Sequence, residues 1–544
     1  MYKEVIFFYF LFLNSYIYSN NISVESFGAF PGDGIDDTIS IQSAISSSDP
    51  DDQIHFQSGT YFISKSIVLK DKHSLSLIGK STIIMFLSSV LGISIKDSSY
   101  ISLIGMTLCY KDKFSFVGQC LSSSKNEAVF HSLNDGFSNS SFIEGITGWS
   151  HLDQRPRKPD LYFKRNQVIV QKDNATNVTI TGLPQNHNIL ADNLYFFRRS
   201  LYGNNTLLSD SSTNVTLSNI NIIGTPGISI HFKDSQNISL LNLLVKPSKD
   251  GDGFSSNADA AHFTRCRGSI FISNCIFMTM GDDAINVHGS YGRLDEVIST
   301  NTIQYVTGRR DVDWPAPAAT VGDVVSIHHP TNPFGKPLVQ GVVLSSQSGS
   351  EDKSLQIALD SPISEDLPKD SVVWNQSTSP SLVVTKCKFL NNRARGILIQ
   401  SSNARIEDNW FQGMTGPAIK VTCDVGRWWE SGPTTNIVIR NNFISDCNDG
   451  PASSKGAITV DADAPGLRPV AGVHQNIEIT GNRIRDVGGM AISISSGSQV
   501  RITQNRISTK DSPFIGVTNS TDVLIENNVS DNATSATVFK PTKP

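Results

Sequence analysis

The C-terminal part of the chain repeats one short pattern, which reads NIEITGN at Asn476–Asn482, QVRITQN at Gln499–Asn505 and DVLIENN at Asp522–Asn528. The copies are 23 residues apart, as the closing residues Asn482, Asn505 and Asn528 show. Within each copy apolar and polar residues alternate, which is typical of a strand with one buried face. The Asn that closes each copy favours a turn. A short strand and a turn at a fixed period predict a solenoid.

A second motif, of the form small-apolar-x-apolar-x, accompanies the first. Its copies are GISIH (227–231), AAHFT (260–264), AINVH (284–288), GILIQ (396–400), AIKVT (418–422), AITVD (457–461) and AISIS (491–495). Stacked apolar columns with Asn turns predict an all-β protein, a right-handed parallel β-helix. A leucine-rich repeat is the alternative, but its leucine signature and helical segments are absent from the sequence.

The segment FGAFPGDGIDDTISIQSAISS (27–47) is a Gly-rich turn followed by a short helical pattern. Asp36 or Asp37 is suited to begin the helix, and Ile41, Ala44 and Ile45 share one of its faces. Because the open end of a solenoid exposes apolar residues, we expect this helix to cap it.

Two regions lack the repeat, and the second contains hairpin-like alternating strands such as VGDVVSIHHP (321–330). We expect both to be small β-barrel-like insertions that wall a cleft, although a purely structural role is equally open. The predicted divisions are 1–20 signal peptide, 21–108 cap and first rungs, 109–173 insertion, 174–289 rungs, 290–380 insertion and 381–544 last rungs.

The N-terminus has Lys3 before a short apolar run from Val5 to Leu13, which is too short to span a bilayer and fits a secretory signal. A buried or interfacial first strand is the alternative. We expect a secreted or periplasmic protein without a membrane span. Net charge is −5 and only 17% of residues are charged, which argues against a nucleic-acid partner.

The seven cysteines include no C-x-x-C pair, so a zinc site is not expected, and their odd number leaves at least one unpaired within a chain. Sequons such as Asn174, Asn214 and Asn237 follow from the repeat and do not by themselves indicate glycosylation. The loop KDGDGFSSNAD (249–259) lacks the ligand spacing of an EF-hand, so we expect no metal and no cofactor. A homodimer is left open.

Alignment of the second motif places one residue before each copy in a vertical column, in which charged residues occur on three rungs. The column reads Pro226, Asp259, Asp283, Arg395, Pro417, Gly456 and Met490. Adjacent rungs of a β-ladder are about 4.8 Å apart, so the charged members are predicted to be neighbours, with Asp282 beside them. The outward columns alongside contain His262, Asn286 and Leu398, then Thr264, His288 and Gln400.

The clustered aspartates predict acid–base chemistry. Three close carboxylates cannot all ionise freely, so at least one is expected to stay protonated while Arg395 holds another ionised. Hydrolysis of a glycosidic bond uses such an acid and base. We expect a bend that lets Asp282 and Asp283 both reach the surface. A ladder of turn aspartates without catalytic function is the structural alternative.

A second polar group follows the Ala418–Thr422 rung in CDVGRWWESG (423–432). Trp428 and Trp429 offer aromatic faces to sugar C–H groups, and Glu430 offers a carboxylate to sugar hydroxyls. Tryptophans that only cover the edge of the solenoid are the alternative.

The segments NADAAHFTRCRG (257–268), MGDDAINVHGSY (280–291) and RARGILIQSSNARIEDNWF (393–411), followed by WWESG and IRNNF, resemble glycoside hydrolase family 110. That resemblance implies a β-helix α-galactosidase with inserted barrels, exo-acting and inverting, which releases terminal α-1,3-linked galactose from blood-group B type or linear glycans. It implies Asp259 as general acid and Asp282 and Asp283 as the residues that position and activate water. His262, Asn286, His288, Arg395, Trp428, Trp429 and Glu430 are the predicted substrate-binding residues.

The N-x-D and Asp-Asp segments are also similar to family 28 polygalacturonases. In that family a Gly-His-Gly and an Arg-x-Lys follow, whereas here His288-Gly289 comes almost at once and no Arg-Ile-Lys is found. A polygalacturonase-like hydrolase and a non-catalytic carbohydrate-binding β-helix therefore remain alternatives to the α-galactosidase.

Overall fold

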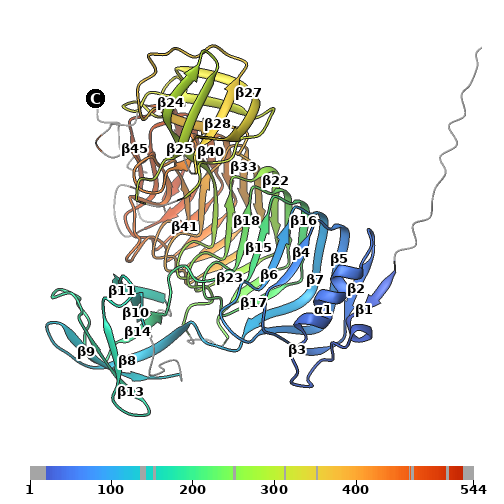
Figure 1. The fold of residues 1–544 in the computed structure, drawn as a ribbon. Coiled ribbons are helices and arrows are strands. Elements are labelled where there is room, and N and C mark those ends of the chain that lie inside the picture. The colour runs from blue at the N-terminus through green and yellow to red at the C-terminus, as the bar shows by residue number, and fades with distance from the viewer. Residues whose placement is uncertain are drawn as a thin grey trace, which may run out of the picture.

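A computed structural model describes residues 20–134, 142–150, 155–248, 253–311, 314–350, 353–464, 466, 471–509 and 514–530. The predicted signal peptide lies outside these residues except for its last position. Most of the described chain winds into a long parallel β-helix, and two antiparallel domains project from it (Figure 1). No helix among the described residues is long and apolar enough to cross a membrane.

Each rung contributes strands to three parallel stacks. The first stack, which carries the second sequence motif, consists of β4 (Ile67–Lys70), β6 (Ile93–Lys96), β15 (Leu207–Asp210), β18 (Ile230–Lys233), β21 (Ala261–Thr264), β24 (Ile285–Ser299), β32 (Ile397–Gln400), β35 (Ile419–Val421), β39 (Gly456–Val460), β42 (Met490–Ser495) and β45 (Ile515–Thr518).

The second stack carries the repeat that opens the sequence argument. It consists of β1 (Asn21–Ser23), β2 (Gln53–Phe56), β5 (His73–Phe86), β7 (Ser99–Tyr110), β16 (Thr213–Ser218), β19 (Gln236–Leu241), β22 (Arg267–Ser273), β30 (Ser381–Thr385), β33 (Ala404–Glu407), β37 (Thr435–Arg440), β40 (His474–Thr480), β43 (Gly497–Thr503) and β46 (Thr521–Glu526). The predicted register is confirmed, because Ile479 pairs with Ile502 and Ile502 with Ile525.

The third stack follows after a two-residue turn, such as Asn242–Leu243 or Asn274–Cys275, and the first of the two is called the turn residue below. It consists of β3 (Gly59–Ile63), the ends of β5 and β7, β17 (Asn221–Ile223), β20 (Leu244–Lys246), β23 (Ile276–Met278), β31 (Lys388–Leu390), β34 (Trp410–Gln412), β38 (Phe443–Ser445), β41 (Arg483–Arg485), β44 (Arg506–Ser508) and β47 (Val529–Ser530). The turn residue has a left-handed backbone, with φ of 55° at both Asn242 and Asn274, a conformation that Asn adopts more readily than most residues.

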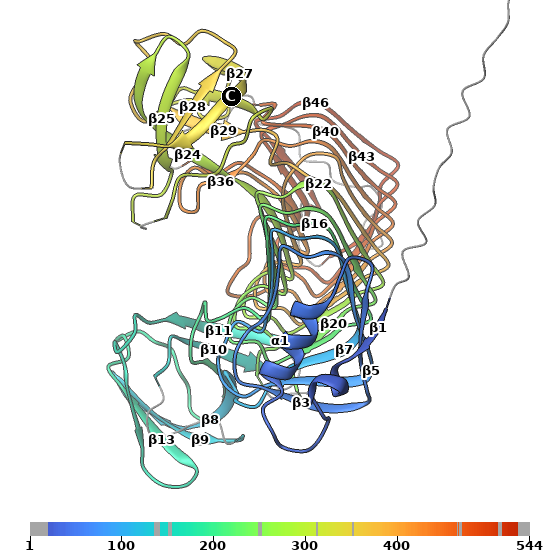
Figure 2. The ribbon, with the colours of Figure 1, turned by 45° about the vertical axis from the view of Figure 1, so that its right-hand side comes forward.

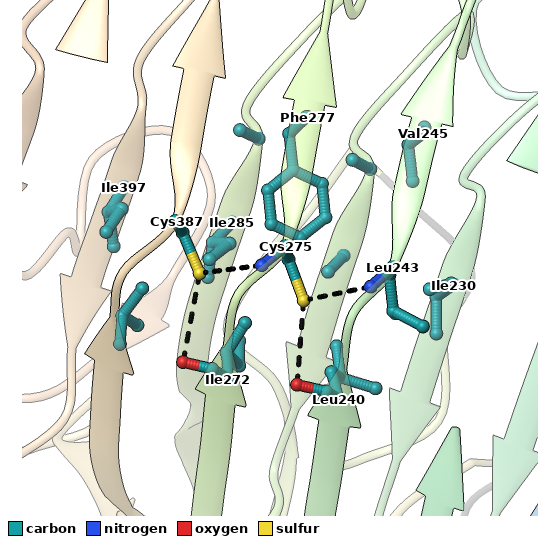
Figure 3. Close-up of a cluster of buried hydrophobic side chains, with 14 of the residues drawn as sticks. Ile230, Leu240, Leu243, Val245, Ile272, Cys275, Phe277, Ile285, Cys387 and Ile397 are labelled. Carbon is teal, nitrogen blue, oxygen red and sulfur yellow. Dashed lines mark hydrogen bonds between the residues drawn. The ribbon is translucent and has the colours of Figure 1, made fainter. Parts of the chain in front are cut away.

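A buried polar ladder runs along this corner of the solenoid. Asn442 donates from its backbone N–H to Asn482 Oδ1 (3.0 Å), Asn482 to Asn505 Oδ1 (2.9 Å) and Asn505 to Asn528 Oδ1 (3.0 Å). On earlier rungs cysteine takes the same place, and the backbone N–H of Cys275 donates to Cys387 Sγ (3.3 Å; Figure 3). Aliphatic and aromatic side chains fill the core around these two thiols. All seven cysteines are free.

The N-terminal helix α1 (Thr38–Ser47) is present as predicted, preceded by the 3-10 turn η1 (Val24–Phe27). Asp37 is its N-cap residue, and Ile41, Ala44 and Ile45 are buried. The helix covers the first rungs at the N-terminal end of the solenoid (Figure 1).

The first insertion is a seven-stranded antiparallel sheet in the order β11-β10-β14-β8-β9-β13-β12. Its strands are β8 (Ser115–Ser123), β9 (Glu127–Ser132), β10 (Gly145–Ser150), β11 (Arg155–Tyr162), β12 (Ile169–Lys172), β13 (Asn177–Thr181) and β14 (Leu194–Arg198). It ends at Arg198 and not at Asp173 as expected. The reason is that NVTIT (177–181) has the pattern of a rung but pairs antiparallel with β9 and β12.

The second insertion is a closed antiparallel barrel. Strand β24 leaves the solenoid and continues into the barrel, which is completed by β25 (Thr302–Thr307), β26 (Val324–His328), β27 (Val339–Ser348), β28 (Leu355–Leu359) and β29 (Val372–Asn375). Both insertions project from the same side of the solenoid (Figure 2).

Candidate active site

The charged column predicted from the sequence is present at the start of the first-stack strands. Ala260 donates its backbone N–H to the carbonyl of Asp283 (3.0 Å), and Ala284 donates to the carbonyl of Arg395 (3.1 Å). The alongside columns are confirmed too, because His262 pairs with Asn286 and Thr264 with His288. Rung stacking therefore brings residues from distant parts of the sequence into one cluster.

Asp283 lies at a bend before β24, but its side chain does not reach the surface as expected. Its carboxylate is 1% exposed and lies 2.5 Å from Arg395 Nη2. The backbone N–H of Arg395 donates to the other carboxylate oxygen at 3.0 Å. A buried carboxylate is stable only when it is paired, and Arg395 supplies the pairing charge.

Asp259 is also buried, and both of its carboxyl oxygens have partners. Oδ1 accepts the backbone N–H of Asp283 at 2.9 Å, and Oδ2 lies 2.5 Å from His262 Nδ1. Burial, together with the nearby charge of Asp283, raises the pKa of Asp259 well above its ordinary value. The shift favours the protonated form of this carboxyl group.

Asp282 is the accessible member of the group, with a side chain that is 24% exposed. Its carboxylate oxygens lie 3.3 Å from the Tyr202 hydroxyl and 3.4 Å from Arg393 Nη1. Burial, with repulsion from Asp283 and Asp259, raises its pKa to about 8. Asp282 therefore carries a proton near neutral pH and can present it to a ligand.

The three aspartates offer oxygens within 4.8 Å of one another. Arg395 already neutralises Asp283 and His262 already bonds to Asp259, so the cluster has its own positive charge and donors, and we assign no metal to it. Residues 249–252 of the 249–259 loop, and with them the question of calcium there, lie outside the described residues.

Two histidines extend the cluster away from Asp259. His262 Nε2 lies 2.8 Å from His288 Nε2, and His288 Nδ1 bonds to the carbonyl of Gly289. Burial lowers the pKa of both rings, that of His288 to about 4, so both are neutral at neutral pH. Each ring nitrogen of this pair has a protein partner, and a sugar hydroxyl would have to displace one.

Glu430 closes the far side of the cluster. Its Oε1 lies 3.7 Å from His288 Nε2, and its Oε2 accepts a hydrogen bond from Gln400 at 2.6 Å. Burial alone would raise the pKa of Glu430, but His288, His262 and the bond from Gln400 lower it. Glu430 is thus a partly buried anion, 15% exposed, that faces the histidine pair.

Two amide oxygens at the cluster can still accept a hydrogen bond from a ligand, one from a predicted site residue and one from a residue beside the predicted ones. Asn286 Oδ1 and Gln400 Oε1 are buried and have no hydrogen-bond partner among the residues that the structure describes. Because an unpaired buried amide oxygen is costly, each is suited to accept a hydroxyl of a bound molecule.

The two tryptophans lie in different surroundings. Trp428 is 36% exposed, with the guanidinium of Arg309 4.8 Å from its ring centroid. Trp429 packs against the buried cluster that contains Tyr291 and Cys423. Its backbone carbonyl accepts the N–H of Tyr291 at 2.9 Å. Trp428 is thus available to a ligand, whereas Trp429 holds the loop to the barrel.

The first insertion supplies residues that the sequence did not identify. Asp160, on β11, accepts from Arg393 Nη2 at 2.6 Å, and Arg198, on β14, donates to the carbonyls of Asn257 (3.2 Å) and Gly281 (2.9 Å). These residues clamp the rungs that carry the aspartates. The sequence offered one signal for these residues, the position of Arg393 close to Arg395 in RARG. Pairing between an insertion and a distant rung leaves no periodic pattern in the sequence.

Profiles of three known families match separate parts of the chain. They are a right handed beta helix region at residues 371–465, a pectate lyase-like profile described as rhamnogalacturonase A/epimerase at 21–193, and glycosyl hydrolases family 28 at 202–308. The predicted right-handed β-helix is thereby confirmed.

Curated relatives include alpha-1,3-galactosidase A of Shewanella woodyi, 28% identical over 54% of this chain and 47% of the relative. The alpha-1,3-galactosidase A of Bacteroides fragilis is 28% identical over 61% of this chain and 55% of the relative. The chain thus spans about half the length of the curated relatives it matches. An exopolygalacturonase of Thermotoga maritima aligns with a TM-score of 0.49 and 13% identity, over 94% of this chain and 92% of that chain.

The motifs around Asp259, Asp282 and Asp283 indicated a resemblance to glycoside hydrolase family 110, and relatives named as α-1,3-galactosidases fit it. The chain is a right-handed β-helix protein related in sequence to the α-1,3-galactosidases.

Proposed function

We propose that the protein is an exo-acting glycoside hydrolase that releases terminal α-1,3-linked galactose from oligosaccharides or glycoconjugates. The observation that carries the proposal is the cluster of Asp259, Asp282 and Asp283, in which one carboxyl group is ion-paired, one is buried with a raised pKa, and one is accessible. The names of the curated relatives supply the substrate.

The geometry suggests a division of roles that differs from the one implied by the family resemblance. Asp282 is accessible and has a pKa of about 8, so we assign it the proton for the leaving oxygen. A proton on Asp259 Oδ2 faces His262 and not the substrate, and Oδ1 has a lone pair left for water. We therefore assign water activation to Asp259 and charge balance to the Asp283–Arg395 pair.

Inversion of the anomeric centre rests on the family resemblance. The aspartate oxygens lie within 4.8 Å, closer than the roughly 6.5–9.5 Å typical of inverting carboxylate pairs. Anomer analysis by NMR during hydrolysis therefore tests this part of the proposal by itself, and an α-anomer as first product would contradict it.

The whole proposal is tested by digestion of α-1,3-, α-1,4- and α-1,6-galactosides, both linear and fucose-branched. We expect galactose release from α-1,3-linked ends, and a loss of about 10³-fold or more in kcat for Asp282→Asn. Asp486→Asn, an exposed turn aspartate on a distant rung, is the matched control. Failure to release galactose from any α-1,3-galactoside would contradict the proposal.

A polygalacturonase-like hydrolase is the second candidate, because the family 28 profile covers residues 202–308 and hence all three aspartates. Release of reducing ends from polygalacturonate, without release of galactose, would favour it. A non-catalytic carbohydrate-binding β-helix would bind glycans unaffected by Asp→Asn changes at the three positions.

We also propose export from the cytoplasm, on the strength of the short apolar run after Lys3. Edman sequencing of the protein recovered from the medium or periplasm would test this, and a mature protein that begins at Met1 would contradict it.

A further inference from the structure

The contacts from Asp259 to Gly289 form an unbroken chain in which every link needs one proton. The links are Asp259 Oδ2 to His262 Nδ1 (2.5 Å), His262 Nε2 to His288 Nε2 (2.8 Å), and His288 Nδ1 to the carbonyl of Gly289. This chain of hydrogen bonds lies beside Glu430, whose Oε1 is 3.7 Å from His288 Nε2.

The far end of the chain fixes where the protons lie. A backbone carbonyl can only accept, so His288 Nδ1 carries a hydrogen. A neutral His288 then has a bare Nε2, so His262 must donate from its Nε2. A neutral His262 in turn has a bare Nδ1, so the proton of the last link belongs to Asp259. The backbone geometry at Gly289 therefore specifies a protonated Asp259, through two histidines.

From this arrangement we propose that His262 and His288 are a proton relay that links Asp259 to Glu430. Water gives a proton to Asp259 Oδ1, and the Oδ2 proton moves to His262 Nδ1. The Nε2 proton of His262 then moves to His288 Nε2. One O–H bond of water breaks, and the imidazolium formed at His288 faces Glu430. The details of catalysis rest on the proposed function, but the resting proton positions do not.

The relay has the proton affinity that such a role needs. The pKa of His288, lowered to about 4 by burial, equals that of an ordinary catalytic carboxylate, so the chain as a whole can act as a base although Asp259 itself is protonated. The other charged groups that act on this hydrogen-bonded chain are Glu430, Asp282, Asp283, Arg395 and Arg265, and the titratable ring of His231 lies against His262.

Nitrogen-15 NMR of the whole protein with labelled histidine tests the resting state directly, without substrate. We expect His262 as the Nε2–H tautomer and His288 as the Nδ1–H tautomer at pH 7. Assignment uses His262→Gln and His288→Gln. A His262 that carries its proton on Nδ1 would place the charge on His288 and overturn the proposal. Galactosidase activity has no bearing on this result.

The kinetic test is Glu430→Gln, which keeps the shape and can still accept from Gln400. Loss of the negative charge disfavours the imidazolium at His288. The acid limb of the kcat/KM profile, expected near pH 4, should therefore move to lower pH, and kcat should fall about tenfold. An unmoved acid limb would overturn the relay.

A second pair of variants separates the relay from simple packing. His262→Phe keeps a ring in place but breaks two links, and we expect kcat to fall about 100-fold with KM within about threefold. His231→Phe is the control, because the His231 ring meets His262 edge to face and its hydrogen bonds among the described residues go to Asn205 and Thr264. Its activity should stay within about twofold. Equal losses in the two variants would contradict the proposal.

If neither galactoside nor polygalacturonate is cleaved by the wild type, the proposed function fails while the NMR result still decides the relay.

Discussion

At the scale of single residues, Asp282 and Asp283 are neighbours in the chain but differ in exposure, since their side chains are 24% and 1% exposed. Stacking of motifs gave the column of Asp259, Asp283 and Arg395, because rung register follows from the repeat. The same reasoning placed Asp282 and Asp283 both at the surface, whereas only Asp282 is accessible. The direction of a side chain at a bend depends on the local backbone angles and on a partner from another rung. The period of the repeat encodes neither.

The raised pKa of Asp282 predicts a stability that depends on pH. Because the folded pKa is about 8 and the ordinary value is 3.8, the folded protein holds a proton that the unfolded chain releases between these pH values. Stability therefore falls as the pH rises through this window. Asp282→Asn removes the effect, so we expect the variant to exceed the wild type by a few kcal/mol at pH 8 and by little at pH 4. Guanidinium unfolding across this range measures the difference.

Asp486→Asn is the control for this measurement, because that aspartate is exposed and lies on a distant rung. A constant offset between Asp282→Asn and the wild type from pH 4 to pH 8 would show that the folded pKa is not raised.

The buried Asp283–Arg395 pair predicts a second residue-scale effect. Arg395→Met leaves the carboxylate of Asp283, 1% exposed, without its charged partner and should cost about 3 kcal/mol of unfolding free energy. The double variant Arg395→Met/Asp283→Asn removes the charge as well and should regain a large part of the loss. Chemical denaturation of both variants at pH 7 checks this. Equal stability of the single and double variants would mean that the pair does not govern folding.

At the scale of elements, the repeat predicted the strands and the stacks, because the same period sets the stacking of apolar side chains and the hydrogen bonding between rungs. The turn Asn residues recognised from the sequence form a buried ladder, in which each side chain accepts the backbone N–H of the previous rung. The end of the first insertion could not be predicted, because β13 has the composition of a rung strand. Its antiparallel partners β9 and β12 decide its place, and they belong to the insertion.

The ladder predicts an unequal response to loss of Asn side chains. Asn482 is fully buried, and its side chain bonds to Asn442, Asn505 and two backbone carbonyls. Asn482→Ala leaves several of these groups unpaired and should lower the free energy of unfolding by about 2–3 kcal/mol.

The exposed ladder of Asn403, Asn436 and Asn476 is the control. Since Asn436 has φ of 60°, Asn436→Gly removes its amide without strain and should change stability by less than about 0.5 kcal/mol. Similar denaturation midpoints for the two variants would contradict a special role for the buried ladder.

At the scale of the whole molecule, the two insertions frame the rungs that carry the aspartates (Figure 2). Asp160 of the first insertion lies 8% exposed and bonds to Arg393, which in turn lies 3.4 Å from Asp282. The barrel is continuous with β24, and β36 (Glu430–Ser431), which carries Glu430, pairs with β24 at Gly289 and Ser290. The absence of the repeat predicted that insertions exist, but their contacts with the aspartates arise from chain segments more than 100 residues apart.

The link from Asp160 through Arg393 to Asp282 predicts that the insertion tunes the active site as well as flanking it. In Asp160→Asn the guanidinium of Arg393 loses its charged partner, and its positive charge then acts chiefly on Asp282. That charge favours the ionised form and lowers the pKa of Asp282 from about 8. If Asp282 supplies the proton to the leaving oxygen, the alkaline limb of kcat/KM moves to lower pH by about one unit. The matched control is Asp449→Asn at the same junction, where the half-exposed Asp449 binds Arg155 and Arg157 and has no contact with Arg393 among the described bonds. Its pH profile should follow the wild type. An alkaline limb that stays in place in Asp160→Asn would mean that the first insertion only supports the rungs.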